Sequence, residues 1–388
     1  MTWLKRIPVS NLIFLLVLPG IVYFFISNVT YQRAFKFIIP GIGVTILAAI
    51  GAYLLAAILG LIAAGLLSLA LGKHTRKYYA VAALTFALLS VFFFSRPSES
   101  YTLAGKLDGR VAIMSGTPAR LSDIIKNGEF AEGAGTQQIR SVSDRARALE
   151  LLEAGDVVTA VFLPSTEVPS GLEELWKIHY LPDRFRNPAL FSAVFALLTF
   201  LLIIGSLHSG AHPLAVFAEL YIDMIRAVPM LVIILYVGFP VSKAIRDASG
   251  LDLPKFLRGM LPIAIGYSAY MAEIFRAGID AIPKGQYEAS RSLGLTGWQT
   301  ARYVILPQAL KIVIPPLGNE FIAMLKDTSL LSVLSIRDLT QRTREFQSNT
   351  FILFPSFNTV AIIYIALTLS ASSVINWIER RNATDKKH

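Results

Sequence analysis

The sequence contains no cysteine among its 388 residues, and charged residues are scarce. The missing cysteine excludes a disulfide framework and a thiolate metal site. Charged residues make up 16% of the chain, against roughly 25% in a typical soluble protein. Hydrophobic residues make up 54%, and the mean hydropathy is +0.57. These figures exclude a disordered or collagen-like chain and predict an integral membrane protein, because one soluble core cannot bury so much apolar surface.

The charge is divided unevenly along the chain. Residues 97–187 carry 10 Lys and Arg against 13 Asp and Glu, whereas the rest of the chain carries 26 against 13. The basic excess therefore belongs to the apolar part, as expected for cytoplasmic loops and for contact with anionic membrane lipid. Nucleic-acid binding is not predicted, since no basic helix or aromatic stacking motif supports it.

Apolar runs near the length of about 20 residues that crosses a bilayer predict eight membrane-spanning helices. They are expected at residues 7–32, 41–72, 78–95, 189–208, 230–241, 260–279, 307–325 and 357–378, with Pro315-Pro316 breaking the seventh. The first run also fits a signal peptide, but no small-residue cleavage site follows it, so we expect a helix that stays in place.

Eight spans place both chain termini on one side of the membrane. Most basic loops then share that side, which the positive-inside rule identifies as the cytoplasm. The basic residues concerned, besides those of the 280–306 loop, are Lys5, Arg6, Lys73, Arg76, Lys77, Arg380, Arg381, Lys386 and Lys387. The agreement is imperfect, since Lys243, Arg246, Lys255 and Arg258 would face outward.

Residues 100–186 have the composition of a soluble domain. Strands are predicted at 110–114, 138–142 and 157–162, with helices at 119–125 and 143–153 between them. Ser143 is the expected N-cap of the second helix and Gly155 its stop. The alternation predicts a small α/β domain with a parallel sheet, placed outside the cytoplasm by the topology above.

The turn formed by Ser115, Gly116 and Thr117 lies between a predicted strand and a predicted helix. Such a turn either holds an anion on its backbone N–H groups or simply caps the helix. Together with the segments 107–117 and 147–155, it resembles the second lobe of periplasmic amino-acid-binding proteins, in which this turn holds the substrate carboxylate. That family also has an aspartate after the last strand, where this chain reads Phe-Leu-Pro-Ser (162–165). The resemblance therefore implies weak amino-acid binding or none.

The loop between the sixth and seventh spans predicts two short helices joined at a sharp turn. Pro283 suits the first turn of a helix, and Gly294 suits the left-handed position that ends it. Thr296 and Gln299 have the spacing of a capping box that starts the second helix, which is expected to end before Pro307. An ordinary loop remains the alternative on this pattern alone.

This loop resembles the coupling motif of ABC importer permeases: Glu-Ala-Ala, three residues, Gly, nine residues, Ile-x-Leu-Pro. The chain has Glu288-Ala289-Ser290, then Gly294, then Val304-Ile305-Leu306-Pro307. Segments 223–229, 269–279, 307–310 and 318–330 also resemble the polar amino-acid branch of these permeases. The arrangement most resembles the large membrane subunit of general L-amino-acid importers, with extra spans and a soluble domain inserted into a five-helix core.

The resemblance implies a mechanism and a set of partners. An ATPase dimer would receive the coupling residues Glu288, Ala289, Ser290, Leu293 and Gly294, and ATP-driven closure would rock the helices. The other implied partners are a second permease subunit, identical or homologous, a periplasmic amino-acid-binding protein, the amino acid and membrane lipid. The implied location is the bacterial inner membrane, multi-pass, with both termini cytoplasmic. Cofactors are expected on the partner ATPase only, as ATP and magnesium, because the chain has no phosphate-binding Gly-x-x-x-x-Gly-Lys motif.

Five polar residues in apolar segments are candidates for the substrate path: Glu273, Asn319, Glu320, Lys326 and Asp327. Charged groups there are costly and normally face an interior or a water-filled path. Asn319 and Lys326 share one helical face and Glu320 and Asp327 the next, so the helix offers both signs to a zwitterion. The alternative is structural pairing, such as Glu273 with Arg276 three residues on.

The predicted fold class is an all-α polytopic membrane protein with a type I ABC importer core and a small inserted α/β extracytoplasmic domain. The predicted parts are an extra helix at 1–36, the first core helix at 37–72, extra helices at 73–98 and 188–210, the α/β domain at 99–187, and the remaining core at 211–388 with the coupling loop at 281–307. The predicted function is the permease subunit of an amino-acid importer, not an enzyme. A ligand-gated channel or receptor is the alternative, and a scaffold protein explains only the spans. The five histidines are scattered, so no metal site is predicted, and no catalytic residues are found.

Overall fold

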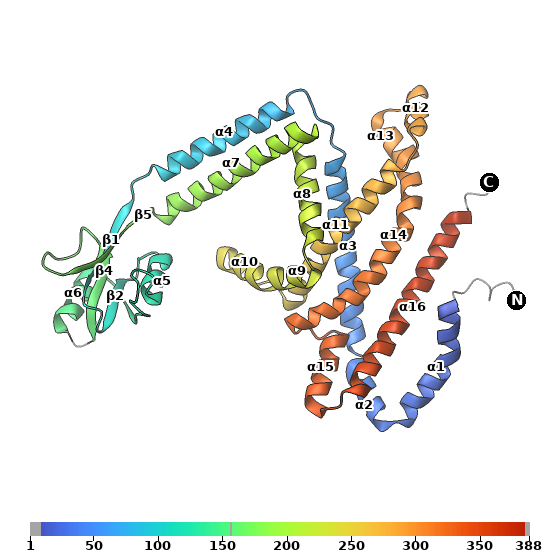
Figure 1. The fold of residues 1–388 in the computed structure, drawn as a ribbon, viewed down its shortest axis with the longest axis horizontal. Coiled ribbons are helices and arrows are strands. Elements are labelled where there is room, and N and C mark those ends of the chain that lie inside the picture. Colours follow the sequence, from blue (N-terminus) through green and yellow to red (C-terminus); the bar gives the residue numbers. More distant parts are fainter. Residues whose placement is uncertain (1–8, 156, 385–388) are drawn as a thin grey trace. The chain divides into compact units, whose positions relative to one another are not determined.

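The structure, a computed structural model, describes residues 9–155 and 157–384 (Figure 1). It divides into two compact units. The first joins the N-terminal part of the chain up to Leu71 to the part from Ala211 onward, and the second is Gly72–Gly210. Lys5, Arg6, Lys386 and Lys387, on which the predicted orientation partly depends, lie outside the described residues.

The first unit is helical throughout its described part. Its N-terminal helices are α1 (Val9–Ser27), α2 (Val29–Ile38) and α3 (Gly41–Leu67). The later elements are α8 (Pro213–Ala227), α9 (Met230–Tyr236), the π-helix η2 (Val237–Val241), α10 (Ser242–Ser249), α11 (Lys255–Asp280), α12 (Lys284–Ser292), α13 (Gly297–Gln299), the π-helix η3 (Thr300–Ile305), α14 (Leu306–Asp327), the 3-10 helix η4 (Thr328–Leu334), α15 (Leu339–Thr350) and α16 (Phe354–Thr384). Within this unit, α12 and α13 lie at one end and α2 and α15 at the other (Figure 1).

The centre of the first unit is the packing of α3 against α11. Small residues on α3, among them Ala52, Ala56 and Gly60, are buried against α11. A methyl group at Gly60 would lie 2.9 Å from the Met271 Cβ and 2.9 Å from the Ser268 carbonyl oxygen, so the helices meet backbone to backbone there. Small residues permit this approach between membrane helices, where dispersion and hydrogen bonds replace the hydrophobic effect.

The described residues contain four helices long and apolar enough to cross a membrane: Val29–Leu67, Thr75–Phe94, Asp183–Ser209 and Phe354–Arg381. A fifth is added if the pair α8 and α9–α10, bent by 105°, counts as one broken span. The predicted span at 7–32 is divided between α1 and α2, because Asn28 caps α2 through its side chain. The predicted start near Gly41 is confirmed, whereas α3 ends at Leu67 and not at Gly72.

The predicted break at Pro315-Pro316 is wrong. Helix α14 continues through both prolines to Asp327. Proline removes a backbone donor and crowds the preceding turn, but neighbouring helices support this one. The Tyr53 hydroxyl of α3 donates to the Leu317 carbonyl at 3.1 Å, and Gly318 lies against Ile375 of α16.

The second unit contains a five-stranded sheet, which two long helices precede and follow in the sequence. The strands are β1 (Glu99–Gly105), β2 (Arg110–Met114), β3 (Ile139–Val142), β4 (Val158–Pro164) and β5 (Glu174–Tyr180), in the order β3-β2-β4-β1-β5. Helices α5 (Ala119–Asn127) and α6 (Arg145–Ala154) contribute to two separate apolar clusters, one around Phe162 and one around Val161. Consecutive residues of a strand face opposite sides of a sheet, so the sheet is covered on both faces.

Two predictions for this unit need correction. The sheet is mixed and not parallel: β2 runs parallel to β3 and β4, but β1 is antiparallel to both β4 and β5. The N-cap of α6 is Asp144 and not Ser143, since the Asp144 carboxylate accepts the Arg147 N–H at 2.9 Å. Gly155 ends α6 in the left-handed conformation, as predicted.

Helices α4 (Thr75–Phe94) and α7 (Asp183–Ser209) flank the sheet in the sequence and pack along each other. Near one end, the Arg76 guanidinium donates to the Ser206 hydroxyl and carbonyl at 3.1 and 2.6 Å. Near the other, the Ser90 hydroxyl donates to the Ala189 carbonyl at 3.1 Å. The two helices therefore form an antiparallel hairpin that carries the sheet.

Candidate functional site

The loop between α11 and α14 contains a short helix that ends in a Schellman motif. The Leu295 N–H donates to the Ser290 carbonyl at 3.1 Å, and the Gly294 N–H donates to the Arg291 carbonyl at 2.9 Å. Gly294 has φ = +76°, in the region that glycine reaches without the steric cost of a Cβ atom. The predicted glycine stop of this helix is therefore confirmed.

The predicted start of the second helix is also confirmed, but its predicted end is not. Thr296 and Gln299 form a capping box, in which the Gln299 N–H donates to the Thr296 hydroxyl at 3.3 Å. The helical backbone then continues through η3 into α14 without stopping at Pro307. Proline cannot make the usual bond to the fourth preceding carbonyl, and the chain meets this loss with a widened π-helical segment.

The surface of α12 divides the predicted coupling residues into two groups. Glu288, Ala289, Leu293 and Gly294 are exposed, whereas Ser290 is buried and donates from its hydroxyl to the Gln286 carbonyl at 2.6 Å. Tyr287 packs against an apolar cluster of Ile282, Ile305 and Ala309, which fixes the helix to the start of α14. One face of α12 is thus anchored while the other is exposed.

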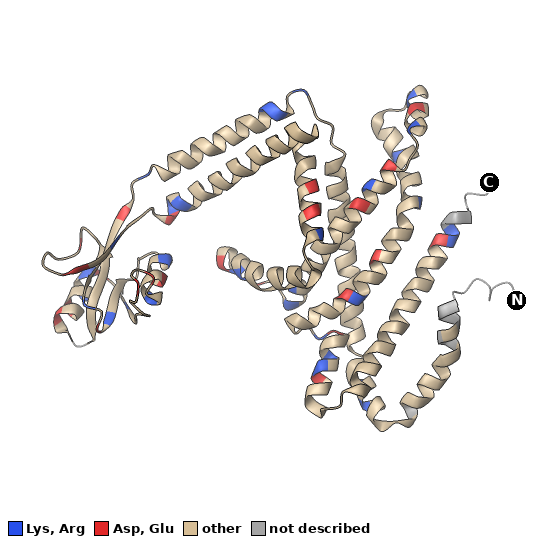
Figure 2. Cartoon of the chain, in the orientation of Figure 1, with Lys and Arg blue, Asp and Glu red and all other residues tan. Residues whose placement is uncertain are grey.

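Three large side chains around the Gly294 turn are unusually exposed. Leu293 is 80% exposed, Trp298 71% and Tyr303 66%. Exposed aromatic residues beside charged ones are typical of a surface that is covered in an assembly. Sequence reasoning selected only Leu293; the signal for the others was the presence of aromatic residues in a polar loop. Figure 2 shows charged residues of α12 at this same end of the unit.

Glu273 forms an ion pair with Arg226, which comes from α8. The alternative partner considered above, Arg276, instead lies 3.6 Å from Asp280 one turn further along α11. The Arg226 guanidinium also lies 5.5 Å from the centre of the Tyr270 ring. A polar tie therefore joins α8 to α11, and sequence reasoning missed Arg226 because the partners are 47 positions apart.

The polar residues of α14 are not all in the same surroundings. The Tyr267 hydroxyl of α11 donates to the Asp327 carboxylate at 2.9 Å, and Glu320 is half-buried. Asn319 and Lys326 are exposed. The structure therefore brings Asp327 to the α11 side of α14, whereas Lys326, the neighbouring cation, is exposed.

The turn at Ser115–Thr117 uses much of its own hydrogen-bonding capacity. The Ser115 N–H and hydroxyl both donate to the Val142 carbonyl, at 2.8 and 3.1 Å. The Thr117 N–H donates to the Met114 carbonyl at 2.9 Å, while the Thr117 hydroxyl oxygen is buried without a partner in the described part of the chain. Two of the three backbone donors expected to hold a carboxylate are therefore already engaged.

Comparison with known proteins places the chain among transport components. Residues 202–384 match the family described as binding-protein-dependent transport system inner membrane component. The chain is 40% identical over 171 residues to the probable glutamine ABC transporter permease protein GlnM of Bacillus subtilis, covering 44% of this chain and 76% of that protein. It is 38% identical over 164 residues to the glutamine transport system permease protein GlnP of Escherichia coli K12, covering 42% and 74%.

One solved structure, titled "Crystal structure of an amino acid ABC transporter with histidines", is 40% identical and has a TM-score of 0.40, over 48% of this chain and 84% of the other. The family match includes α12, Gly294 and α14, whereas the sheet of the second unit lies outside it.

Proposed function

The chain belongs to the family of binding-protein-dependent transport system inner membrane components, and on that premise we propose that it forms the translocation path of an importer for amino acids. It is a permease subunit of an ABC transporter in the inner membrane and is not itself an enzyme, since ATP hydrolysis belongs to a partner ATPase. The observation that carries the proposal is the exposed face of α12 with the Gly294 turn, inside the region that matches the transport family. The comparisons give the channel or receptor interpretation no support.

We propose that this exposed face enters a cleft of the ATPase, which holds ATP and magnesium. Because Tyr287 and its apolar neighbours anchor α12 to the start of α14, a displacement of α12 would pass directly into that helix. A short, stiff helix suits such a lever. The exposed Leu293, Trp298 and Tyr303 supply the apolar contact area, and Glu288 supplies charge at its edge.

The orientation and the assembly follow from the same proposal. With α12 at the ATPase, the end of the first unit that holds α12 and α13 faces the cytoplasm, and the end that holds α2 and α15 faces outward. Two cytoplasmic termini, as predicted from the sequence, are part of this proposal. A second permease, identical or homologous, and a periplasmic binding protein complete the proposed importer.

The substrate path is proposed along the faces of α3, α11 and α14 that contain polar groups. Tyr53, Tyr267, Glu320 and Asp327 contribute to these faces. A carboxylate such as Glu320 would hold the ammonium group of an amino acid in surroundings where charge is costly unless paired. Glu273 is a weaker candidate, because Arg226 already neutralises it.

Reconstitution of the complete importer tests the proposed function. The chain, purified with the subunits that accompany it, is expected to import amino acids into proteoliposomes only when ATP reaches the ATPase side. The measurement is uptake of radiolabelled neutral, acidic and basic amino acids, with the complex lacking ATP as the control. Uptake without ATP, or an ion current gated by an amino acid, would instead establish the channel.

The sheet of the second unit is proposed to contact the binding protein or another subunit and not to be the primary substrate site. It has its own apolar clusters on both faces, so we expect residues 99–187 to fold alone. The turn at Ser115–Thr117 has few free donors, and no acid follows β4 directly to bind an ammonium group. A single lobe also leaves most of a small ligand in water.

Calorimetry on residues 99–187 is therefore expected to show binding of amino acids no tighter than millimolar, which corresponds to about 4 kcal/mol. Substitution of Ser115→Ala is expected to leave the titrations unchanged. Far-UV circular dichroism checks that the wild-type and the variant domain are both folded. Micromolar binding of any amino acid by the folded wild-type domain would make this domain a receptor in its own right.

A further inference from the structure

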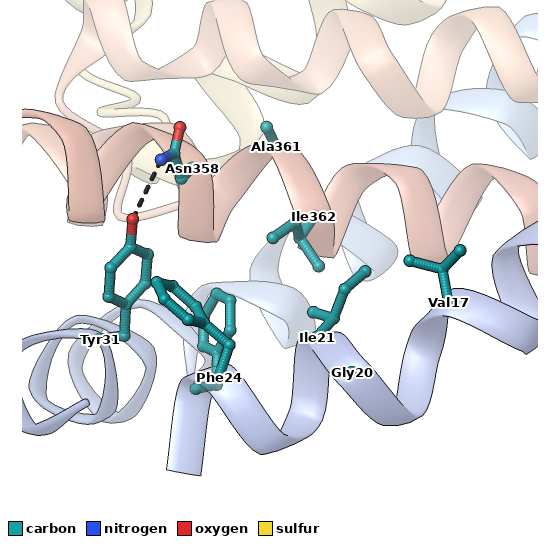
Figure 3. Close-up of a pocket in the computed structure, with 9 residues that line it drawn as sticks. Val17, Gly20, Ile21, Phe24, Tyr31, Asn358, Ala361 and Ile362 are labelled. Atoms are coloured by element: carbon teal, nitrogen blue, oxygen red, sulfur yellow. Dashed lines mark hydrogen bonds between the residues drawn. The ribbon is translucent and has the colours of Figure 1, made fainter. Parts of the chain in front are cut away.

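Two cavities lie along the seam between α1 and α16. One, of about 390 Å³, is lined by residues of both helices, including Val17, Ile21 and Ile362 (Figure 3). The other, of about 550 Å³, shares Ile21 and Ile362 with it. The lining is mostly apolar. Helix α1 therefore does not close against α16 over this stretch, and the open apolar space suits an apolar occupant better than ordered water.

The two helices are instead held near the end that leads into α2. The Asn358 amide of α16 donates to the Tyr31 hydroxyl of α2 at 3.1 Å (Figure 3). The Phe25 ring lies 5.0 Å from the Tyr31 ring and 6.1 Å from the Phe35 ring. These polar and aromatic contacts, called here the Tyr31–Asn358 clamp, tie both α16 and α1 to α2, and through α2 they set the spacing of α1 from α16 beside the opening.

The depth of the larger cavity matches one leaflet of a bilayer. Along α16 its lining extends from Thr359 to Ser370. At 1.5 Å per residue this is roughly 16 Å. Half of the hydrocarbon core of a membrane is about 15 Å. The cavity has the length of a lipid acyl chain that reaches from the interface to the bilayer centre.

Two basic side chains lie where the headgroup of such a lipid would be. Gln32 and Lys36 of α2 line the larger cavity, and Arg33 is exposed on the same helix, three residues before Lys36. Residues three apart share a helix face. Within the described part of the chain, neither Arg33 nor Lys36 forms an ion pair. Among the described residues these two positive charges have no partner, and they lie beside an apolar slot.

We propose that this groove between α1, α2 and α16 is a binding site for one anionic phospholipid, with an acyl chain between α1 and α16 and its phosphate group at Lys36 and Arg33. The lipid fills the space that the Tyr31–Asn358 clamp holds open and attaches α1 to the helical core. The site is independent of the substrate path and of the coupling helix, so its failure would leave the proposed transport function unaffected.

Native mass spectrometry of the full chain in detergent tests the site. Phosphatidylglycerol and phosphatidylcholine with identical acyl chains are titrated, so that only the headgroup charge differs. Wild type is expected to retain one phosphatidylglycerol more tightly than phosphatidylcholine. The double substitution Arg33→Gln and Lys36→Gln is expected to weaken phosphatidylglycerol binding about 25-fold, since each cation near an anionic lipid contributes about a fivefold factor. Lys243→Gln, an exposed lysine on α10, is the matched control and is expected to change nothing.

A second pair of variants tests the apolar slot. Ala366 lines the larger cavity, whereas Ile365 is 46% exposed and does not line it. Ala366→Phe is expected to displace the bound lipid, and Ile365→Phe is expected to leave it bound. Equal affinity for the two headgroups, or a lipid that survives both Ala366→Phe and the double cation substitution, would overturn the proposal.

Discussion

Substitution of Gly294→Asp is expected to abolish ATP-driven uptake while the protein stays in the membrane at wild-type abundance. Gly294 has φ = +76°, and a side chain there costs roughly 1–2 kcal/mol of backbone strain. No heavy atom lies within 4 Å of the Cβ that the substitution adds, so the rest of the fold is not disturbed. The new carboxylate instead occupies the surface proposed to enter the ATPase. Uptake into proteoliposomes and ATP hydrolysis by the complex are measured together, and hydrolysis is expected to continue uncoupled from transport.

Gly210→Asp is the matched control. Gly210 also ends a helix in the left-handed conformation, with φ = +71° and no heavy atom within 4 Å of an added Cβ. Its backbone strain is the same, but it lies outside the coupling loop, so uptake is expected to persist. The charge reversal Glu288→Lys on the exposed face of α12 is expected to act as Gly294→Asp does. Wild-type uptake by either coupling variant at normal abundance would exclude α12 as the contact with the ATPase.

The parts of the structure that the sequence predicted are those specified by short-range signals. The start of α3 at Gly41, the stop at Gly294 and the capping box of Thr296 each depend on residues within a few positions of one another. The same holds for β2 and β4, whose apolar residues form short runs. The helix–turn–helix start of the 281–307 loop could therefore be predicted from the sequence, whereas the end of its second helix could not.

The parts that were missed depend on distant neighbours. Strands β1 and β5 pair with each other across about 70 intervening residues. Their mixed polar and apolar composition does not predict strands, and the antiparallel pairing is what stabilises them. Helix α14 survives Pro315-Pro316 because α3 and α16 support it. Local propensity predicted a break there, and tertiary contacts prevailed over it. Arg226 was missed for the same reason, since its partner lies on another helix.

The second large effect is expected at the ion pair of Arg226 and Glu273. Removing one partner leaves the other charge unpaired in an apolar unit, which costs 3–5 kcal/mol for a fully buried pair. These side chains are 38% and 43% exposed, so a loss of about 2 kcal/mol is expected for Arg226→Gln or Glu273→Gln alone. The measurement is the midpoint of thermal unfolding in detergent. Arg276→Gln is the control on the same helix; its pair with Asp280 is more exposed, and a loss within about 1 kcal/mol is expected.

The double substitution Arg226→Gln with Glu273→Gln separates a structural role from a place in the substrate path. With neither charge left unpaired, most of the lost stability is expected to return. Uptake is expected to return with it, because a carboxylate already neutralised by an arginine has little capacity left for a substrate ammonium group. If stability returns but uptake does not, Glu273 contacts the substrate and joins Glu320 and Asp327 in the path. If neither returns, the contact between α8 and α11 needs both charges. In that case the single variant Arg226→Lys is expected to be more stable than Arg226→Gln but less stable than wild type, since lysine keeps the charge but not the planar guanidinium.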